Sequence, residues 1–84
     1  MNNRHRKTLE AIFSEPVSRN IAWRRIENLL IAVNCEMIEG SGSRVAFKSG
    51  TLRADFHRPH PSKEAKPYQV RAVREFLQQL EIEP

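Results

Sequence analysis

The side chains best suited to chemistry lie in one short stretch that holds two of the three histidines of the chain. His57 and His60 flank Arg58 and Pro59, and two lysines follow shortly after. An imidazole can accept or donate a proton near pH 7, and cationic side chains bind phosphate. The pattern therefore predicts either acid–base chemistry or a surface on which loop histidines only help to dock a partner.

Three other candidate sites carry less support. His5 lies near the N-terminus, where we expect a frayed segment. Asp55, His57 and His60 are spaced by two and three residues at a strand end, which is not a recognised metal-ligand pattern. Cys35 has no adjacent positive charge to stabilise a thiolate, so we expect a small buried side chain. We therefore expect neither a metal nor another cofactor.

The composition describes one small domain. The chain has 84 residues, of which 39% are hydrophobic and 29% charged, as in folded proteins rather than disordered tails. No apolar run approaches the roughly 18 residues that a membrane span needs. No apolar signal core follows the basic N-terminus, and a single cysteine excludes an internal disulfide framework. We expect a cytoplasmic protein without membrane association.

The formal net charge of +4 conceals an uneven distribution. Residues 40–74 carry eight Lys or Arg and two acidic residues, a net charge of +6, whereas residues 8–39 are net negative. A basic face attracts a polyanion, and salt weakens that attraction. We expect the cations between Gly42 and Arg74 to gather on a single exposed side. The alternative is a basic surface that is merely solvated.

Helical periodicity predicts three helices around these groups. The first covers residues 8–14 and ends before a proline. The second begins near residues 20–22, with Asn20 the expected N-cap, and ends at Asn34 in the left-handed conformation. Pro67 suits the first position of the third. The apolar stripes are Leu9, Ile12 and Phe13 in the first, Trp23, Ile26, Leu29, Leu30 and Val33 in the second, and Val70, Val73, Phe76, Leu77 and Leu80 in the third.

Alternating side chains predict three strands at residues 35–39, 44–48 and 51–56, with a tight hairpin at Ser49-Gly50. The fold class is therefore α+β, with the order α-α-β-β-β-α and a three-stranded antiparallel sheet whose helices pack on one face. In such a meander, the start of the second strand lies near the end of the third. Arg44 is thus expected to face the loop that contains His57 and His60.

From Trp23 onward, the order α-β-β-β-α is that of the double-stranded-RNA-binding-domain fold, and the chain resembles the HicA family of bacterial toxins from type II toxin–antitoxin pairs. Residues 26–30, 40–47 and 56–68 carry the resemblance, which covers residues 22–82. They correspond to the amphipathic helix, the Gly-Ser-His element before the second strand, and the His-Pro-rich loop before the last helix.

The preceding segment, residues 1–20, is expected to be an N-terminal extension with a short helix, followed by a HicA-like domain over residues 21–84. The extension either covers the core or forms a homodimer contact through Leu9, Ile12 and Phe13.

The resemblance implies a toxin that cuts mRNA and is neutralised by a HicB-type antitoxin. In the family, the His of Gly-Ser-His is catalytic, but here Gly42 and Ser43 are followed by Arg44. A guanidinium stays protonated and cannot act as a base, although it binds phosphate. We therefore expect Arg44 to hold phosphate while His57 or His60 supplies metal-independent acid–base chemistry. The alternative is a non-catalytic module that binds RNA or the antitoxin.

Basic and aromatic side chains complete the expected RNA-binding site. Tyr68 stands among basic residues and is the expected base-stacking group, whereas the other aromatic residues at helix or strand positions are expected in the core. The expected RNA contacts are Ser43, Arg44, Lys48, Arg58, Lys63, Lys66, Tyr68 and Arg71, and the expected core aromatics are Trp23, Phe47, Phe56 and Phe76.

Overall fold

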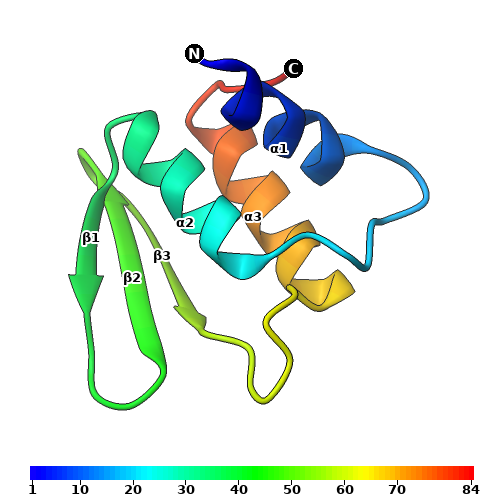
Figure 1. Cartoon of the computed structure of the whole chain (residues 1–84). Coiled ribbons are helices and arrows are strands. Elements are labelled where there is room, and N and C mark those ends of the chain that lie inside the picture. The colour runs from blue at the N-terminus through cyan, green and yellow to red at the C-terminus, as the bar shows by residue number, and fades with distance from the viewer.

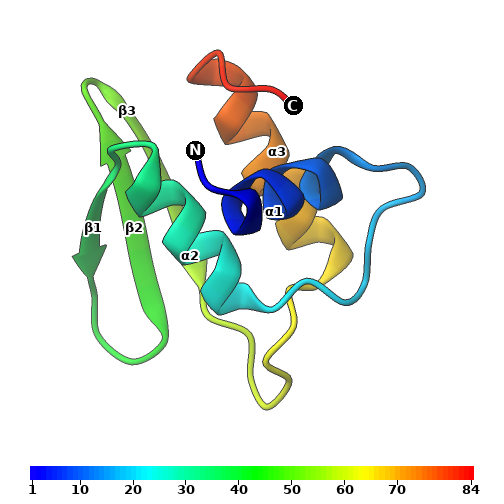
Figure 2. The ribbon, with the colours of Figure 1, turned by 45° about the horizontal axis from the view of Figure 1, so that its top comes forward.

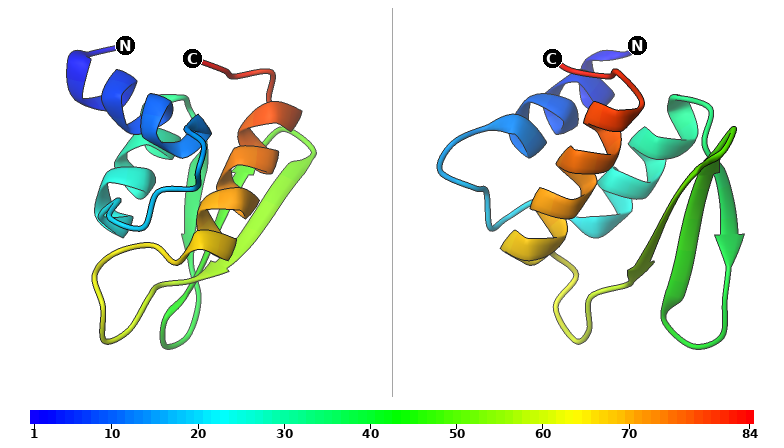
Figure 3. Two further views of the ribbon diagram at one scale, coloured as in Figure 1. Left: turned by 90° about the vertical axis from the view of Figure 1, so that its right-hand side faces the viewer. Right: turned by 180° about the vertical axis from the view of Figure 1, so that it is seen from behind.

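A computed structural model describes all residues, Met1–Pro84, and confirms the order α-α-β-β-β-α. The helices are α1 (Asn3–Phe13), α2 (Trp23–Ala32) and α3 (Pro67–Gln79), and the strands are β1 (Glu36–Glu39), β2 (Arg44–Ser49) and β3 (Leu52–His57). The strands form one antiparallel sheet in the order β1-β2-β3. All three helices lie on one side of this sheet and leave its other face uncovered (Figures 1 and 3).

Alternation along the strands separates a buried face from an outer face. Val45, Phe47 and Phe56 are buried against the helices, whereas Arg44 and Lys48 of β2 are exposed on the outer face. Strands β2 and β3 are joined by a two-residue loop, Gly50–Thr51, one position later than the predicted turn. Gly50 has a φ of +60°, which glycine adopts without steric cost at the first position of such a loop.

The core lies between the sheet and the helix pair α2 and α3. Phe47 at its centre is fully buried, and the rings of Trp23 and Phe56 meet edge to face at 5.3 Å between centroids. Phe76 is also buried, so the four aromatic residues predicted for the core are there. The third helix follows the prediction closely, because Pro67 is its first residue and its apolar stripe is buried.

Helix α1 is longer than predicted and belongs to the core. It begins at Asn3 because the Oδ1 of Asn2 accepts a hydrogen bond from the backbone N–H of His5 at 2.8 Å. His5 is therefore helical and half-buried, and the prediction of a frayed segment is wrong. Leu9 and Ile12 are buried against α2 and α3, on the side away from the sheet (Figure 2). These two side chains cover the core of their own chain, whereas Phe13, the third residue of the expected contact, is only partly buried.

Arg74 of α3 fastens the end of α1. Its guanidinium donates to the backbone oxygens of Ile12 at 2.9 Å and Ser14 at 3.0 Å, and it forms an ion pair with Glu15. It also lies over the ring of Phe13, 5.9 Å from the centroid. Carbonyls at the end of α1 that have no helical partner are thus satisfied by a side chain distant in sequence.

The loop of residues 58–66 decides where α2 begins. The backbone N–H of Trp23 donates to the carbonyl of Lys63 at 2.9 Å, and that of Ala65 donates to the carbonyl of Ile21 at 2.8 Å. These bonds hold the chain extended up to Ala22, so the prediction of Asn20 as N-cap is wrong. Asn34, by contrast, has the left-handed conformation predicted after the helix, with a φ of 74°.

Candidate nucleic-acid interface

Arg44 and His57 face one another across the sheet. The start of β2 lies near the end of β3, as predicted, and Arg44 and His57 are register partners there. The next cross-strand pair, Ser43 and Arg58, is joined by a backbone hydrogen bond: the Arg58 N–H donates to the Ser43 carbonyl at 2.8 Å. In an antiparallel ladder such bonds alternate, so Arg44 and His57 form a pair of the closely spaced kind, with Cα atoms about 4.5 Å apart. Both side chains are exposed on the outer face.

The His57 imidazole has one hydroxyl neighbour and a fixed main chain. Its Nδ1 lies 3.4 Å from the Oγ of Ser43, and its Nε2 has no hydrogen-bond partner within the chain. The His57 carbonyl accepts a hydrogen bond from the Nε2 of buried Gln69 at 2.7 Å, and the Oε1 of Gln69 accepts one from the backbone N–H of Lys66 at 2.9 Å. Gln69 therefore links the end of β3 to the start of α3. Because it bonds only the main chain of His57, the imidazole Nε2 keeps no partner within the chain.

His60 is placed differently from His57. It is exposed near the tip of the loop formed by residues 58–66 and makes no hydrogen bond within the chain. The backbone hydrogen bonds that join this loop to the start of α2 come later in the chain than His60, at Lys63 and Ala65. Of the two histidines proposed for acid–base chemistry, only His57 is thus held beside Arg44.

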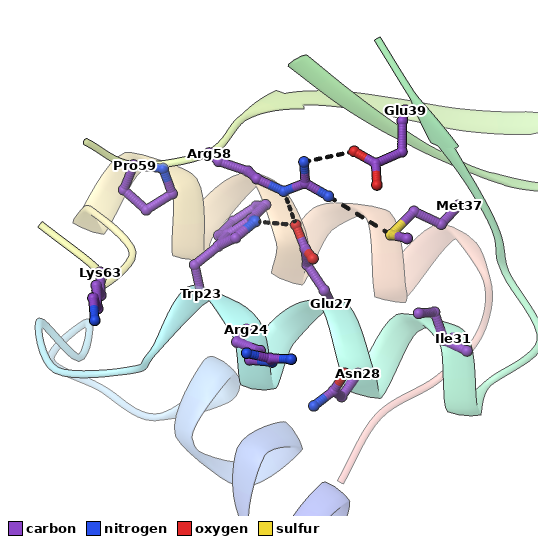
Figure 4. Close-up of a pocket in the computed structure, with 10 residues that line it drawn as sticks. All are labelled: Trp23, Arg24, Glu27, Asn28, Ile31, Met37, Glu39, Arg58, Pro59 and Lys63. Carbon is purple, nitrogen blue, oxygen red and sulfur yellow. Dashed lines mark hydrogen bonds and ion pairs between the residues drawn. The ribbon is translucent and has the colours of Figure 1, made fainter. Parts of the chain in front are cut away.

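The side chain of Arg58 is partly buried and forms ion pairs with two carboxylates of the same chain. Its Nε donates to Glu27 of α2 at 2.7 Å and its guanidinium also donates to Glu39 of β1 at 2.7 Å. Glu27 in turn accepts a bond from the indole N–H of Trp23 at 2.6 Å, and the Arg58 guanidinium lies 3.9 Å from the sulfur of Met37 (Figure 4). The bonds to Glu27, and then to Glu39, raise the pKa of Arg58 above its ordinary value. Arg58 was expected to contact RNA, but its side chain points into a groove between α2 and β1 (Figure 4).

The remaining cations do not share one face. Three of the eight in residues 40–74 form ion pairs: Arg53 with Asp55, Arg58 with Glu27 and Glu39, and Arg74 with Glu15. Of the five without ion pairs, Arg44 and Lys48 lie on the outer face of the sheet. Lys63, Lys66 and Arg71 lie in the loop and the first turns of α3.

One end of the molecule nevertheless concentrates the free cations. The turn 40–43, the loop 58–66 and the starts of α2 and α3 all lie at this end (Figures 1 and 3). Lys48 is further along the sheet, so four of the five cations without ion pairs belong to this end. Exposed Tyr68, with 60% of its surface accessible, stands there too, in the first turn of α3. The free cations of residues 40–74 thus lie mostly at one end of the molecule, and the prediction that they gather on a single exposed side is wrong.

The other candidate sites do not assemble. Asp55 is bonded to Arg53, and no group of three His, Cys, Asp or Glu side chains is placed to hold a metal ion. Cys35 is buried as predicted, and burial raises the pKa of its thiol above the ordinary range, which opposes nucleophilic use. The positions of these two side chains follow from strand alternation and core packing.

Three residues that hold Arg58 and the main chain of His57 in place were not predicted as part of the site: Glu27, Glu39 and Gln69. Helical periodicity predicts for Glu27 only a place on the polar side of α2, and alternation predicts for Glu39 only a place in β1. Gln69 stands three residues after Lys66, the spacing at which a side chain returns to the N-cap N–H of a helix, and that spacing could have revealed it. No comparable sequence signal joins Arg58 to Glu27, because they are distant along the chain and meet only in the folded state.

The segment from α2 to α3 has the order of the double-stranded-RNA-binding-domain fold: one helix, a three-stranded antiparallel meander and a second helix. Four of the five free cations in residues 40–74 lie at one end, where a histidine and an arginine are cross-strand partners. The fold and the cations at this end define a small basic α+β domain.

Comparison with protein families gives the particular family. The model of the HicA toxin of bacterial toxin–antitoxin systems matches residues 23–82, which is more than half of the chain. The chain belongs to the HicA toxin family and is a toxin of a toxin–antitoxin system, whose partner is an antitoxin. The match begins at the first residue of α2, so α1 lies outside it. Searches of the curated proteins and of the solved structures gave no match. No helix of the chain has the length and apolar character required to cross a bilayer.

Proposed function

We propose that this toxin binds RNA at the end of the molecule formed by turn 40–43, loop 58–66 and the start of α3, and cleaves it without a metal ion. The observation that carries the proposal is the cross-strand pair of Arg44 and His57, with Ser43 beside the imidazole. The resemblance to HicA places a catalytic histidine where this chain has Arg44. Here an imidazole stands directly opposite that position, on the neighbouring strand.

Two proton transfers and one charge stabilisation make up the proposed reaction. His57 Nε2 takes the proton of a ribose 2′-hydroxyl, and the 2′-oxygen bonds to the adjacent phosphorus. The bond from phosphorus to the 5′-oxygen breaks, and water supplies the proton that the leaving oxygen needs. The products are a 2′,3′-cyclic phosphate and a 5′-hydroxyl. Arg44 holds the phosphate and offsets the negative charge that develops on its oxygens.

Binding would follow from the cations and the exposed ring around this pair. Lys63, Lys66 and Arg71 supply charge without sequence preference, and Tyr68 supplies a face on which a base can stack. Because the same end carries the proposed site, a HicB-type antitoxin that covers it would block both binding and cleavage.

Incubation of the purified chain with a long RNA, with and without a chelator, tests the proposal. We expect cleavage that survives the chelator, leaves 2′,3′-cyclic phosphate ends and is lost in His57→Ala and Arg44→Ala. His60→Ala is the matched control, because His60 lies in the same loop region without a partner, and it should cleave as the wild type does. Unchanged cleavage in His57→Ala would refute the assigned role.

A non-catalytic module is the second candidate function, and one observation favours it. The Ser43–His57 separation of 3.4 Å is long for a hydrogen bond, and no carboxylate orients the imidazole. In that case the chain would bind RNA or its antitoxin without cutting, and overexpression would not arrest growth. Gain of cutting in Arg44→His would then show that only the proton-transfer group is missing.

A further inference from the structure

We infer that Arg58, with Glu27 and Glu39, is a clamp that positions His57 for the proposed reaction and does not bind RNA itself. The inference rests on the proposed function for its catalytic consequence, but the clamp is defined by contacts within the protein. Arg58 directly follows His57, so a constraint on one acts on the other through a single peptide bond.

The contacts of Arg58 reach three elements at once. Its backbone N–H bonds the Ser43 carbonyl at 2.8 Å, which closes the ladder beside the Arg44–His57 pair. Its guanidinium bonds Glu27 of α2 and Glu39 of β1, both at 2.7 Å. One residue therefore ties the end of β3 to β2 through its backbone, and to α2 and β1 through its side chain.

Alternation explains why the clamp leaves the catalytic face free. Adjacent residues of a strand point to opposite faces, so Arg58 enters the groove beside α2 while His57 stays exposed on the outer face (Figure 4). Gln69 holds the His57 carbonyl at 2.7 Å from the side of α3. The peptide group that joins His57 to Arg58 is thus anchored at both its carbonyl and its N–H, which limits the motion of the main chain that carries the imidazole.

Charge and burial favour this role over RNA binding. The Glu27 side chain is only 13% exposed and accepts bonds from both Arg58 and the indole N–H of Trp23. Turning Arg58 toward RNA would leave the Glu27 carboxylate buried without its cation, which is costly. The Arg58 guanidinium also donates to two carboxylates at once, and their negative charges leave little of its positive charge to attract phosphate.

Substitutions of Arg58 and of Glu27 distinguish a positioning role from an RNA-binding role, because only the RNA-binding role predicts opposite changes in RNA affinity. If Arg58 positions His57, then Arg58→Ala and Glu27→Gln both lower kcat, by about tenfold to a hundredfold, with KM for RNA little changed. If Arg58 instead binds RNA, Arg58→Ala weakens RNA binding while Glu27→Gln, which frees the guanidinium, strengthens it. Glu36→Gln on the exposed side of β1 makes the same change of charge without touching the clamp, and should match the wild type.

A measurement without RNA separates failure of the clamp from failure of the proposed catalysis. In the full-length chain, NMR reports the nitrogen shifts of the His57 ring and the hydrogen exchange of the Arg58 N–H. Glu27→Gln and the milder Glu39→Gln should broaden or move the ring signals and speed that exchange, even if the wild type cleaves nothing. Ring signals and exchange equal to those of the wild type in both variants, or tighter RNA binding in Glu27→Gln, would overturn the inference.

Discussion

Substitution of Ile12 by alanine tests whether α1 is part of the folding unit, although it lies outside the family match. Ile12 is fully buried between α1 and the pair α2 and α3. The change removes three carbons, each worth about 0.8 kcal/mol of transfer free energy. The packed surroundings cannot fully close the space that is left, so we expect a loss of about 3 kcal/mol in the free energy of unfolding.

Urea denaturation followed by circular dichroism measures this loss. A chain of this length has a total stability of roughly 4–13 kcal/mol, so the variant should show a clearly lower midpoint. The thermal midpoint should fall by about 12–24 °C. Glu10→Ala is the matched control, since Glu10 is on the same helix but exposed, and it should leave both midpoints nearly unchanged.

A small effect would refute the reasoning. If Ile12→Ala lost less than about 0.5 kcal/mol, as exposed substitutions usually do, α1 would not pack on the core in solution. Residues 1–20 would then be a separable extension, and the HicA-like domain would fold without them.

Three further predictions concern the site and the core. A Cβ on Gly40 would lie 3.0 Å from the Cβ of Arg44, so Gly40→Ala should displace the start of β2 and reduce RNA cleavage, whereas Ser41→Ala in the same turn should not. Lys63→Ala and Lys66→Ala should each reduce the slope of log affinity for single-stranded RNA against log salt by about 0.7, and unchanged slopes would place the RNA elsewhere. Because burial raises the pKa of Cys35 above its ordinary value of 9.0, the unfolded chain ionises first, so stability is complete below that value and falls as the pH rises above it. Urea melts from about pH 8 to 11 should show this fall in the wild type beyond that of Cys35→Ala, and equal slopes would contradict it.

Local signals determined most of the fold. Helical spacing of apolar residues, alternation in the strands, Gly50 at the hairpin and Pro67 at the start of α3 each act within a few residues, so they can be read without the tertiary structure. That the start of β2 lies near the end of β3 also followed, because the strands form a meander. The register did not follow, because the turn lies one residue later than predicted, which shifts each cross-strand partner by two residues and brings Arg44 opposite His57.

Boundaries set by distant partners could not be read in this way. The N-cap of α2 is Ala22 rather than the predicted Asn20, because the carbonyl of Lys63, far along the chain, accepts the Trp23 N–H. Similarly, α1 became part of the core because α2 and α3 offer it an apolar surface. The sequence alone leaves open whether this segment covers the core or forms a homodimer contact.

The sequence by itself determined the class of the molecule: a small α+β domain with an excess of cations in its second half. Only the tertiary structure decided which cations are free. Arg58 and Arg74 count as positive charge in the sequence, yet each is neutralised by carboxylates from other elements. The physical reason is that ion pairing depends on distances between side chains, which folding sets independently of their separation along the chain.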